Sequence, residues 1–186
     1  IGFITLSILV LAVLILPGLL HLDPYTTGHG VPFSAPSKGF PLGVDNAGRD
    51  SFARLVYGGR VSLLVGLLST AISVLIGLPL GILAAYYGGV LDTIIMRIAD
   101  VFISFPSTIF ILVLVSVIGP SMWTLIFVMG FLSWPEFARL IRSSVLSVRR
   151  KEYVESARAI GAKDARVIGR YILPNSLGPI IVAATF

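Results

Sequence analysis

A charged segment, Glu152–Pro174, carries most of the side chains in this sequence that could form a specific binding surface. It lies between stretches that are almost entirely apolar. Within it, apolar and aromatic residues recur at helical spacing and charged residues surround them, which predicts a short amphipathic helix parallel to a membrane surface. These residues are Tyr153, Val154, Ala157, Ile160 and Gly161.

Glycine and proline set the shape predicted for this segment. Gly161 is expected to end the amphipathic helix, because glycine accepts the left-handed conformation that is common after a helix. Asp164 can then cap a second helix that climbs into the membrane. Leu173-Pro174 and Pro179 lie inside that second helix and are expected to bend it. We therefore predict an elbow that could transmit a push, the alternative being an ordinary charged cytoplasmic loop.

Motifs for catalysis and nucleotide binding are not found in the sequence. A P-loop needs a glycine-rich turn that ends in Gly-Lys-Ser/Thr, but Lys38, Lys151 and Lys163 are the only lysines and none follows a glycine. No Ser/His/Asp set or acid pair is placed for catalysis, and two lone histidines make a poor metal site. We expect no enzyme activity, cofactor or metal in this chain.

Composition places the chain in the membrane class. Of its 186 residues, 56% are hydrophobic and 12% are charged, whereas soluble domains carry roughly 25% charged residues. The net charge of +5 does not indicate nucleic-acid binding, because the basic residues collect between apolar segments. The absence of cysteine excludes disulfides and thiolate metal sites.

The lengths of the apolar runs predict an all-α, polytopic transmembrane helix bundle, because a membrane helix needs about 20 mostly apolar residues. Gly119-Pro120 is expected to divide the longest run into two helices. The predicted single domain, 1–186, has spans at 3–22, 61–88, 93–118, 121–148 and 165–186, an external segment at 23–59 and a cytoplasmic loop at 149–164. The sequence begins with Ile1 instead of Met and ends in the apolar run Ile180–Phe186. We therefore expect a fragment of a longer chain, whose last span is truncated or only just completed.

Charge distribution predicts the orientation of these spans. Four basic residues lie between the first two spans and ten lie on the other side, which places the N-terminus and the 149–164 loop in the cytoplasm. Arg49–Gly59 is expected to form a short amphipathic helix on the outer membrane surface. A membrane span at 3–22 is favoured over a signal peptide, because the segment lacks a basic n-region and an A-x-A-like cleavage site.

Two further features suggest contacts between helices. Gly77 and Gly81 lie one turn apart, and small residues at this spacing allow membrane helices to approach closely. Packing within this chain is favoured over a gating contact or a contact with another chain. Asp100 lies near an apolar stretch and is expected to pair with Arg97, three residues earlier. Glu136, Arg139 and Arg142 are interpreted as charges at the cytoplasmic end of a span.

The spacing of Glu155-Ser156-Ala157, Gly161 and Leu173-Pro174 resembles the "EAA" loop of ABC importer permeases. Ser156 and Tyr171 depart from that pattern, where Ala and Ile are usual. Pro41–Leu63, Tyr86–Asp100 and Trp134–Val148 resemble the dipeptide, oligopeptide and nickel group, specifically its second permease subunit.

The resemblance implies a permease in a bacterial or archaeal cytoplasmic membrane, with the bilayer as its environment. Its partners would be a second permease subunit, two ATP-binding subunits that bind ATP and Mg, and an extracytoplasmic substrate-binding protein. Residues 149–164 would be the coupling loop, with Glu155 at the dock and Gly161 at the turn. Substrate-binding residues are unknown.

Peptides are the expected substrate, a nickel-type permease being the alternative. An ion-coupled secondary transporter is a further alternative, which would favour ionisable groups near the bilayer midplane. The absence of charged residues from Val61–Leu91 and Val101–Pro135 weighs against it. A membrane-embedded enzyme would need convergent catalytic side chains, which the sequence lacks.

Overall fold

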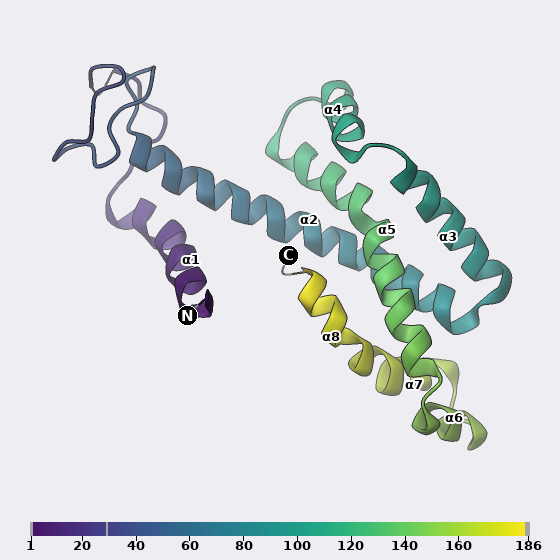
Figure 1. Cartoon of the computed structure of the whole chain (residues 1–186). Coiled ribbons are helices and arrows are strands. Elements are labelled where there is room, and N and C mark those ends of the chain that lie inside the picture. The colour runs from purple at the N-terminus through teal and green to yellow at the C-terminus, as the bar shows by residue number, and fades with distance from the viewer. Residues whose placement is uncertain (1, 29, 185–186) are drawn as a thin grey trace. The chain divides into compact units, whose positions relative to one another are not determined.

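The computed structural model describes residues 2–28 and 30–184, and this part of the chain is helical apart from one long irregular segment and short turns between helices (Figure 1). Within it there is no strand, only an isolated bridge between Val44 and Asp50. The elements are α1 (Gly2–Leu19), α2 (Ser51–Tyr87), α3 (Gly89–Ser104), α4 (Ser107–Ile118), α5 (Met122–Arg149), α6 (Glu152–Ala159), α7 (Asp164–Val167), a π-helical turn (Ile168–Ile172) and α8 (Leu173–Ala184). The predicted all-α fold is confirmed.

The chain divides into two compact units, residues 1–64 and 65–186. The division falls inside α2. The first unit holds α1, the irregular segment and the beginning of α2. The second unit holds the rest of α2 and the helices that follow it. Residues 1, 29, 185 and 186 belong to the predicted domain but lie outside the described residues.

Asp45 organises the irregular segment of the first unit. Its carboxylate accepts hydrogen bonds from the Ala47 and Arg49 amides at 2.8 and 3.0 Å. The Arg49 Nε donates to it at 2.9 Å, and the Arg54 guanidinium forms a second ion pair. Partial burial alone would raise the pKa of the Asp45 carboxyl, but these hydrogen bonds outweigh it and hold the pKa far below its usual range.

The beginning of α2 differs from the prediction. The Asp50 side chain caps the helix by accepting a hydrogen bond from the Phe52 amide at 2.8 Å. From Ser51 the helix then runs without a break to Tyr87, so Arg49–Gly59 does not form a separate amphipathic helix. Gly58 and Gly59 do not end it, because an interior glycine costs only about 1 kcal/mol relative to alanine.

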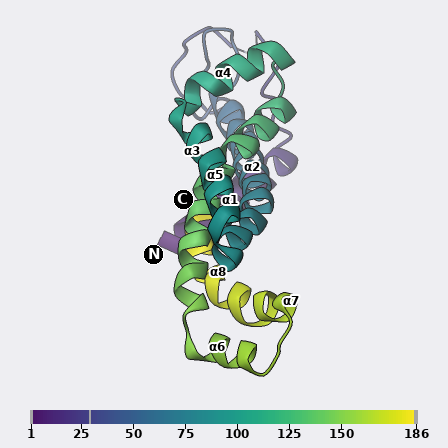
Figure 2. The same cartoon turned by 90° about the vertical axis from the view of Figure 1, so that its right-hand side faces the viewer.

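α5 is the central helix of the second unit and contacts α3, α4 and α8 (Figure 2). One buried cluster joins α2, α3 and α5; it consists of Ala84, Ile95, Ala99, Trp134 and Ala138. A second cluster joins α2 and α5 to α6, α7 and the π-helical turn; its members include Ile82, Tyr86, Ile141, Val145, Val154, Val167 and Ile172. The C-terminal half of α2 and most of α5 therefore form the scaffold to which α6 is attached.

The span predicted over 93–118 is not one helix. α3 and α4 are bent by 83° relative to each other, and Phe105 between them is extended, with φ −92° and ψ 137°. Proline disfavours the helical conformation of the residue before it, so Pro106 accounts for the break. The predicted break at Gly119-Pro120 is confirmed, because α4 ends at Ile118 and the Ser121 hydroxyl caps α5 by accepting from the Thr124 amide at 3.0 Å.

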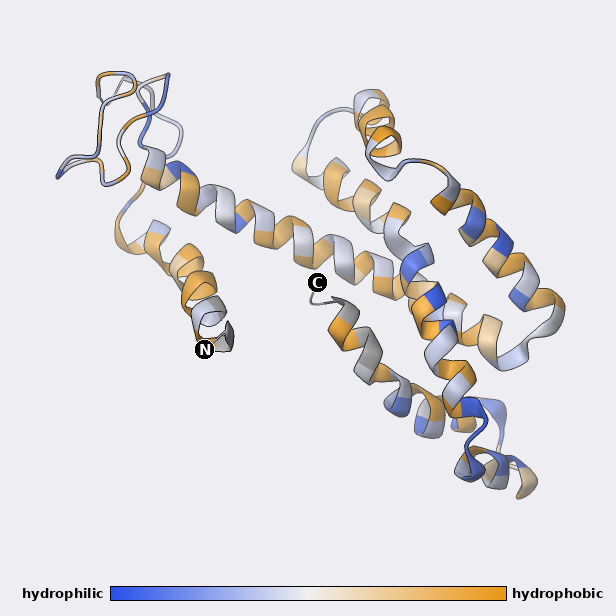
Figure 3. Cartoon of the chain, viewed as in Figure 1, coloured by the Kyte–Doolittle hydropathy of each residue, from blue (hydrophilic) through white to orange (hydrophobic). Residues whose placement is uncertain are grey.

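Within the described residues, α2 and α5 are each long and apolar enough to cross a membrane. The bent pair α3–α4 can be counted as a third span, and Ser7–Leu19 is a shorter apolar stretch. Figure 3 shows that α4 is mostly hydrophobic, whereas hydrophilic residues gather on and around α6. The five-span arrangement stays a prediction.

Candidate coupling surface

α6 has one buried and one exposed face. Val154 and Ala157 are 0% and 3% exposed and belong to the inner face. Glu155 and Ser156 are exposed, and just after the helix Ile160 is 85% exposed. Figure 2 shows α6 at one end of its unit, beyond the end of α5. The buried side chains therefore attach α6 to the rest of its unit, and the exposed residues form a surface that is partly acidic and partly apolar.

Gly161 ends α6 in the manner predicted. Its φ is +81°, a conformation that costs a residue with a side chain about 1–2 kcal/mol. The Gly161 amide donates to the Arg158 carbonyl at 2.9 Å, and the Ala162 amide donates to the Ala157 carbonyl at 3.0 Å. These two bonds form a Schellman motif, which satisfies carbonyls at the helix end.

The next helix begins differently from the prediction. Lys163 is the N-cap residue of α7, and its side chain makes no capping hydrogen bond. Asp164 is already the first helical residue. Its carboxylate instead accepts a hydrogen bond from the Tyr86 hydroxyl at 2.6 Å. Asp164 therefore does not cap α7 but forms a long-range contact with α2.

Leu173-Pro174 follows an irregular helical turn, as expected for a proline in this position. The Leu173 amide donates to the Ile168 carbonyl, five residues back, which closes a π-helical turn. α7, the π-helical turn and α8 follow one another without a gap, so Pro174, which has no N–H to donate to the carbonyl four residues earlier, lies inside a continuous helix. The Asn175 side chain donates to the Tyr171 carbonyl at 2.6 Å. α8 continues past Pro179 to Ala184.

Arginines gather between α5 and α6. A hollow of about 350 Å³ is lined by Leu146, Arg149, Arg150, Glu155 and Arg158. The Arg149 Nη1 donates to the Ala85 carbonyl at 2.9 Å, and the Arg158 guanidinium carbon lies 4.6 Å from the centre of the Tyr86 ring. The surface beside Glu155 is therefore basic.

Gly77 and Gly81 lie where α2 packs against α5. A Cβ at Gly77 would lie 2.8 Å from the Trp134 carbonyl oxygen, and one at Gly81 would lie 2.6 Å from the Ala138 carbonyl oxygen. Both contacts are within this chain, which is the packing that the sequence favoured over an intersubunit contact.

Sequence reasoning missed the continuation of this contact toward the N-terminal part of α2. The Ser73 hydroxyl donates to the Gly130 carbonyl at 2.9 Å and also lies 3.0 Å from the Ser69 carbonyl oxygen. A Cβ at Gly130 would lie 2.7 Å from the Ile72 Cβ. Ser69, Ser73, Gly77 and Gly81 recur every four residues. Small residues at this spacing allow membrane helices to approach closely, so the full pattern predicts the longer contact.

The ion pair predicted between Arg97 and Asp100 is wrong. Asp100 pairs with Arg139 of α5 instead, and Arg142 donates through Nε and Nη2 to the two carboxylate oxygens of Asp92, each at 2.6 Å. An i,i+3 pair contributes only about 0.2–0.5 kcal/mol, which is too little to hold Asp100 on Arg97 when a packed helix offers Arg139. Of the two pairs found, the one between Arg142 and Asp92 is bidentate, which adds both energy and geometric specificity. Arg139 and Arg142, interpreted as charges at the end of one span, therefore join α5 to α3.

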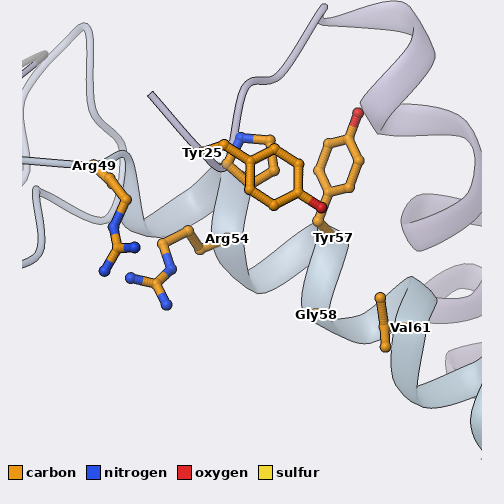
Figure 4. Close-up of a pocket in the computed structure, with 7 residues that line it drawn as sticks. Tyr25, Arg49, Arg54, Tyr57, Gly58 and Val61 are labelled. Atoms are coloured by element: carbon orange, nitrogen blue, oxygen red, sulfur yellow. The ribbon is translucent and has the colours of Figure 1, made fainter. Parts of the chain in front are cut away.

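A second hollow, of about 320 Å³, lies in the first unit (Figure 4). Tyr25 and Tyr57 meet edge to face there, with ring centres 6.4 Å apart. Arg49 and Arg54 line the same hollow and both pair with Asp45. The irregular segment and the beginning of α2 therefore share a hollow lined by two tyrosines and two arginines.

These helices define an integral membrane protein with an exposed amphipathic helix attached to its bundle. Residues 77–186 match the family described as "Binding-protein-dependent transport system inner membrane component", and the chain belongs to that family.

Curated relatives extend the similarity over the whole sequence. The chain is 38% identical to a dipeptide transport system permease protein, DppC, of Alkalihalophilus pseudofirmus, a match that covers 100% of this chain and 61% of the relative. It is 37% identical to a putative peptide transport system permease protein of Brucella suis, over 100% of this chain and 62% of the relative. It is 42% identical to a glutathione transport system permease protein, GsiD, of Pectobacterium atrosepticum, over 79% of this chain and 49% of the relative. The chain thus spans about three fifths of the length of the first two relatives.

Proposed function

We propose that this chain is the membrane permease part of an ATP-driven importer of the peptide group, and that α6 is the helix on which a separate ATPase subunit docks. The observation that carries the proposal is the two-faced burial of α6. Val154 and Ala157 attach it to the bundle, while Glu155, Ser156 and Ile160 remain exposed. The resemblance of its sequence to the EAA loop supports the same role.

The shape of the α6–α7 elbow suits the transmission of force. α6 is short and ends in a tight Schellman turn, so a push on its exposed face is not absorbed by a long flexible loop. The two-subunit ATPase would move α6 when it closes on ATP, and the helices packed on α6 would follow. ATP and Mg would bind to those partner subunits, and this chain would hydrolyse nothing itself.

The remaining partners follow from the same proposal. A second permease subunit would complete the translocation path, and an extracytoplasmic binding protein would deliver the substrate. We propose di- or oligopeptides, or a related small solute, as that substrate, because the relatives are named for dipeptide, peptide and glutathione transport. The excess of basic residues around α6 supports a cytoplasmic location for α6 and for the N-terminus.

A bulky charge at the turn after α6 tests this proposal. In the intact complex reconstituted in liposomes, Gly161→Arg is expected to retain ATP hydrolysis but to lower peptide uptake by at least about fivefold, the low end of typical coupling between two sites. The matched control is Gly169→Arg, also at an exposed glycine but without a positive φ. Normal uptake by a normally assembled Gly161→Arg complex would show that the assignment of α6 is wrong.

A further inference from the structure

The C-terminal end of α2 is held by charged side chains from three other helices. The buried Tyr86 donates its hydroxyl proton to the Asp164 carboxylate of α7 at 2.6 Å. The Arg158 guanidinium of α6 lies over the face of the same ring, 4.6 Å from its centre. Arg149 of α5 donates to the carbonyl of the preceding residue, Ala85, at 2.9 Å. One aromatic side chain therefore joins α2 to both arms of the elbow.

The two contacts on the Tyr86 side chain are strengthened by their surroundings. Tyr86 is only 5% exposed, and a hydrogen bond to an ionised carboxylate is roughly twice as strong as a neutral one. A cation over an aromatic ring is also held more firmly where water is excluded. The Arg158 Nε is buried with no hydrogen-bond partner in the described part of the chain. The face of the Tyr86 ring therefore contributes to the stabilisation of this guanidinium.

We propose that Tyr86 is a positioning residue that couples α6 and α7 directly to α2. The inference rests on the proposed role of α6 as the docking helix. Along the chain, α6 is joined only to α5 and α7. Tyr86 and Asp164 are 78 residues apart in sequence, so their contact is a second route for motion that bypasses the covalent connections.

The geometry makes this route effective. Arg158 lies on the ring and Asp164 at the hydroxyl, so the elbow cannot move away from α2 without breaking at least one of the two contacts. Ile82, one turn earlier in α2, belongs to the same buried cluster as Val154 and Val167. Farther along α2, Gly77 and Gly81 pack against the backbone of α5. A displacement of α6 therefore reaches the interior of the bundle through α2.

Removing one hydroxyl tests the route with little change in shape. In the intact complex in liposomes, we expect Tyr86→Phe to lower the amount of peptide imported per ATP hydrolysed by at least about fivefold. The matched control is Tyr87→Phe, because Tyr87 is exposed and its ring meets the Tyr86 ring edge to face, a contact that phenylalanine keeps. This control is expected to import as much peptide per ATP as the wild type.

Variants of the acceptor separate coupling from simple stability. Asp164→Ala should lower import per ATP as Tyr86→Phe does, while Asp164→Asn, whose amide oxygen can still accept the hydroxyl, should restore part of it. The double variant Tyr86→Phe/Asp164→Ala should lose no more than either single variant, because both remove the same contact.

Two results would overturn the inference: equal import per ATP in Tyr86→Phe, Tyr87→Phe and wild type, or losses that add in the double variant. The wild-type complex separates this failure from failure of the proposed function. If wild type shows no ATP-dependent uptake, the proposed function fails. If wild type couples and the Tyr86 variants couple equally well, only the role of Tyr86 is wrong.

Discussion

At the scale of single residues, two positions depend on a conformation or a charge that few replacements reproduce. Gly161 needs a positive φ to close the turn after α6. Asp45 gathers two backbone amides and two arginines around one carboxylate. Local sequence rules predicted that Gly161 ends α6, because the left-handed turn after a helix is a local property. They did not predict the Asp45 cluster, which forms in a segment with no helical or strand pattern.

Replacement of Gly161 by alanine should destabilise the protein through backbone strain alone. A Cβ added at Gly161 or at Gly169 would have no atom outside the neighbouring residues within 4 Å, so added bulk is not the difference between the two. We expect Gly161→Ala to cost about 1–2 kcal/mol, measured as a lower midpoint in thermal unfolding. Gly169→Ala, in a helical turn, should be neutral or slightly stabilising. An equal loss in both variants would contradict the strain argument.

The Asp45 cluster should respond to acid. Because the folded pKa lies below the unfolded value of about 3.9, the stabilisation is fully present above that value and is lost as the pH falls toward the folded pKa. Asp45→Asn should therefore lower the thermal midpoint at pH 7, and the difference from wild type should shrink below about pH 4. Glu136→Gln, at an exposed carboxylate, serves as the control. A difference that stays constant from pH 7 to pH 3 would exclude this linkage.

At the scale of helices, the contact between α2 and α5 depends on close backbone approach. Gly77, Gly81 and Gly130 each leave no room for a side chain. The glycine spacing predicted that α2 packs closely, but it did not identify α5 as the partner. The helix break at Phe105-Pro106 was also missed, although a residue before proline is a probable helix boundary. Pro106 lies inside a long apolar run, and the length of that run favoured a single span over a break at this proline.

Filling this contact should be costly. Gly81→Ala places a Cβ 2.6 Å from a backbone oxygen, and such overpacking typically costs about 1–3 kcal/mol. Thermal unfolding of the detergent-solubilised protein would measure the loss. Gly66→Ala is the matched control, since it lies in the same helix with nothing within 4 Å. If both variants unfold at the same temperature, the close α2–α5 contact is not present in the protein.

At the scale of the whole molecule, composition and run lengths were sufficient to predict a helical membrane protein, and the charged segment predicted the elbow. Contacts between distant residues could not be predicted in the same way. Asp100 pairs with Arg139, and Asp164 with Tyr86, because the packing of the second unit brings their helices together. The sequence alone offered nearer partners for both acids.

The most direct test of the central claim is cross-linking from the exposed face of α6. The sequence contains no cysteine, so Ser156→Cys and Ile160→Cys provide single attachment points for a short cross-linker in the intact complex. Val117→Cys on α4, which is 80% exposed in this chain, is the control. The account predicts a product joined to the ATPase subunit from both α6 positions and none from position 117. Absence of that product from both α6 positions, in a complex that contains the ATPase, would contradict it.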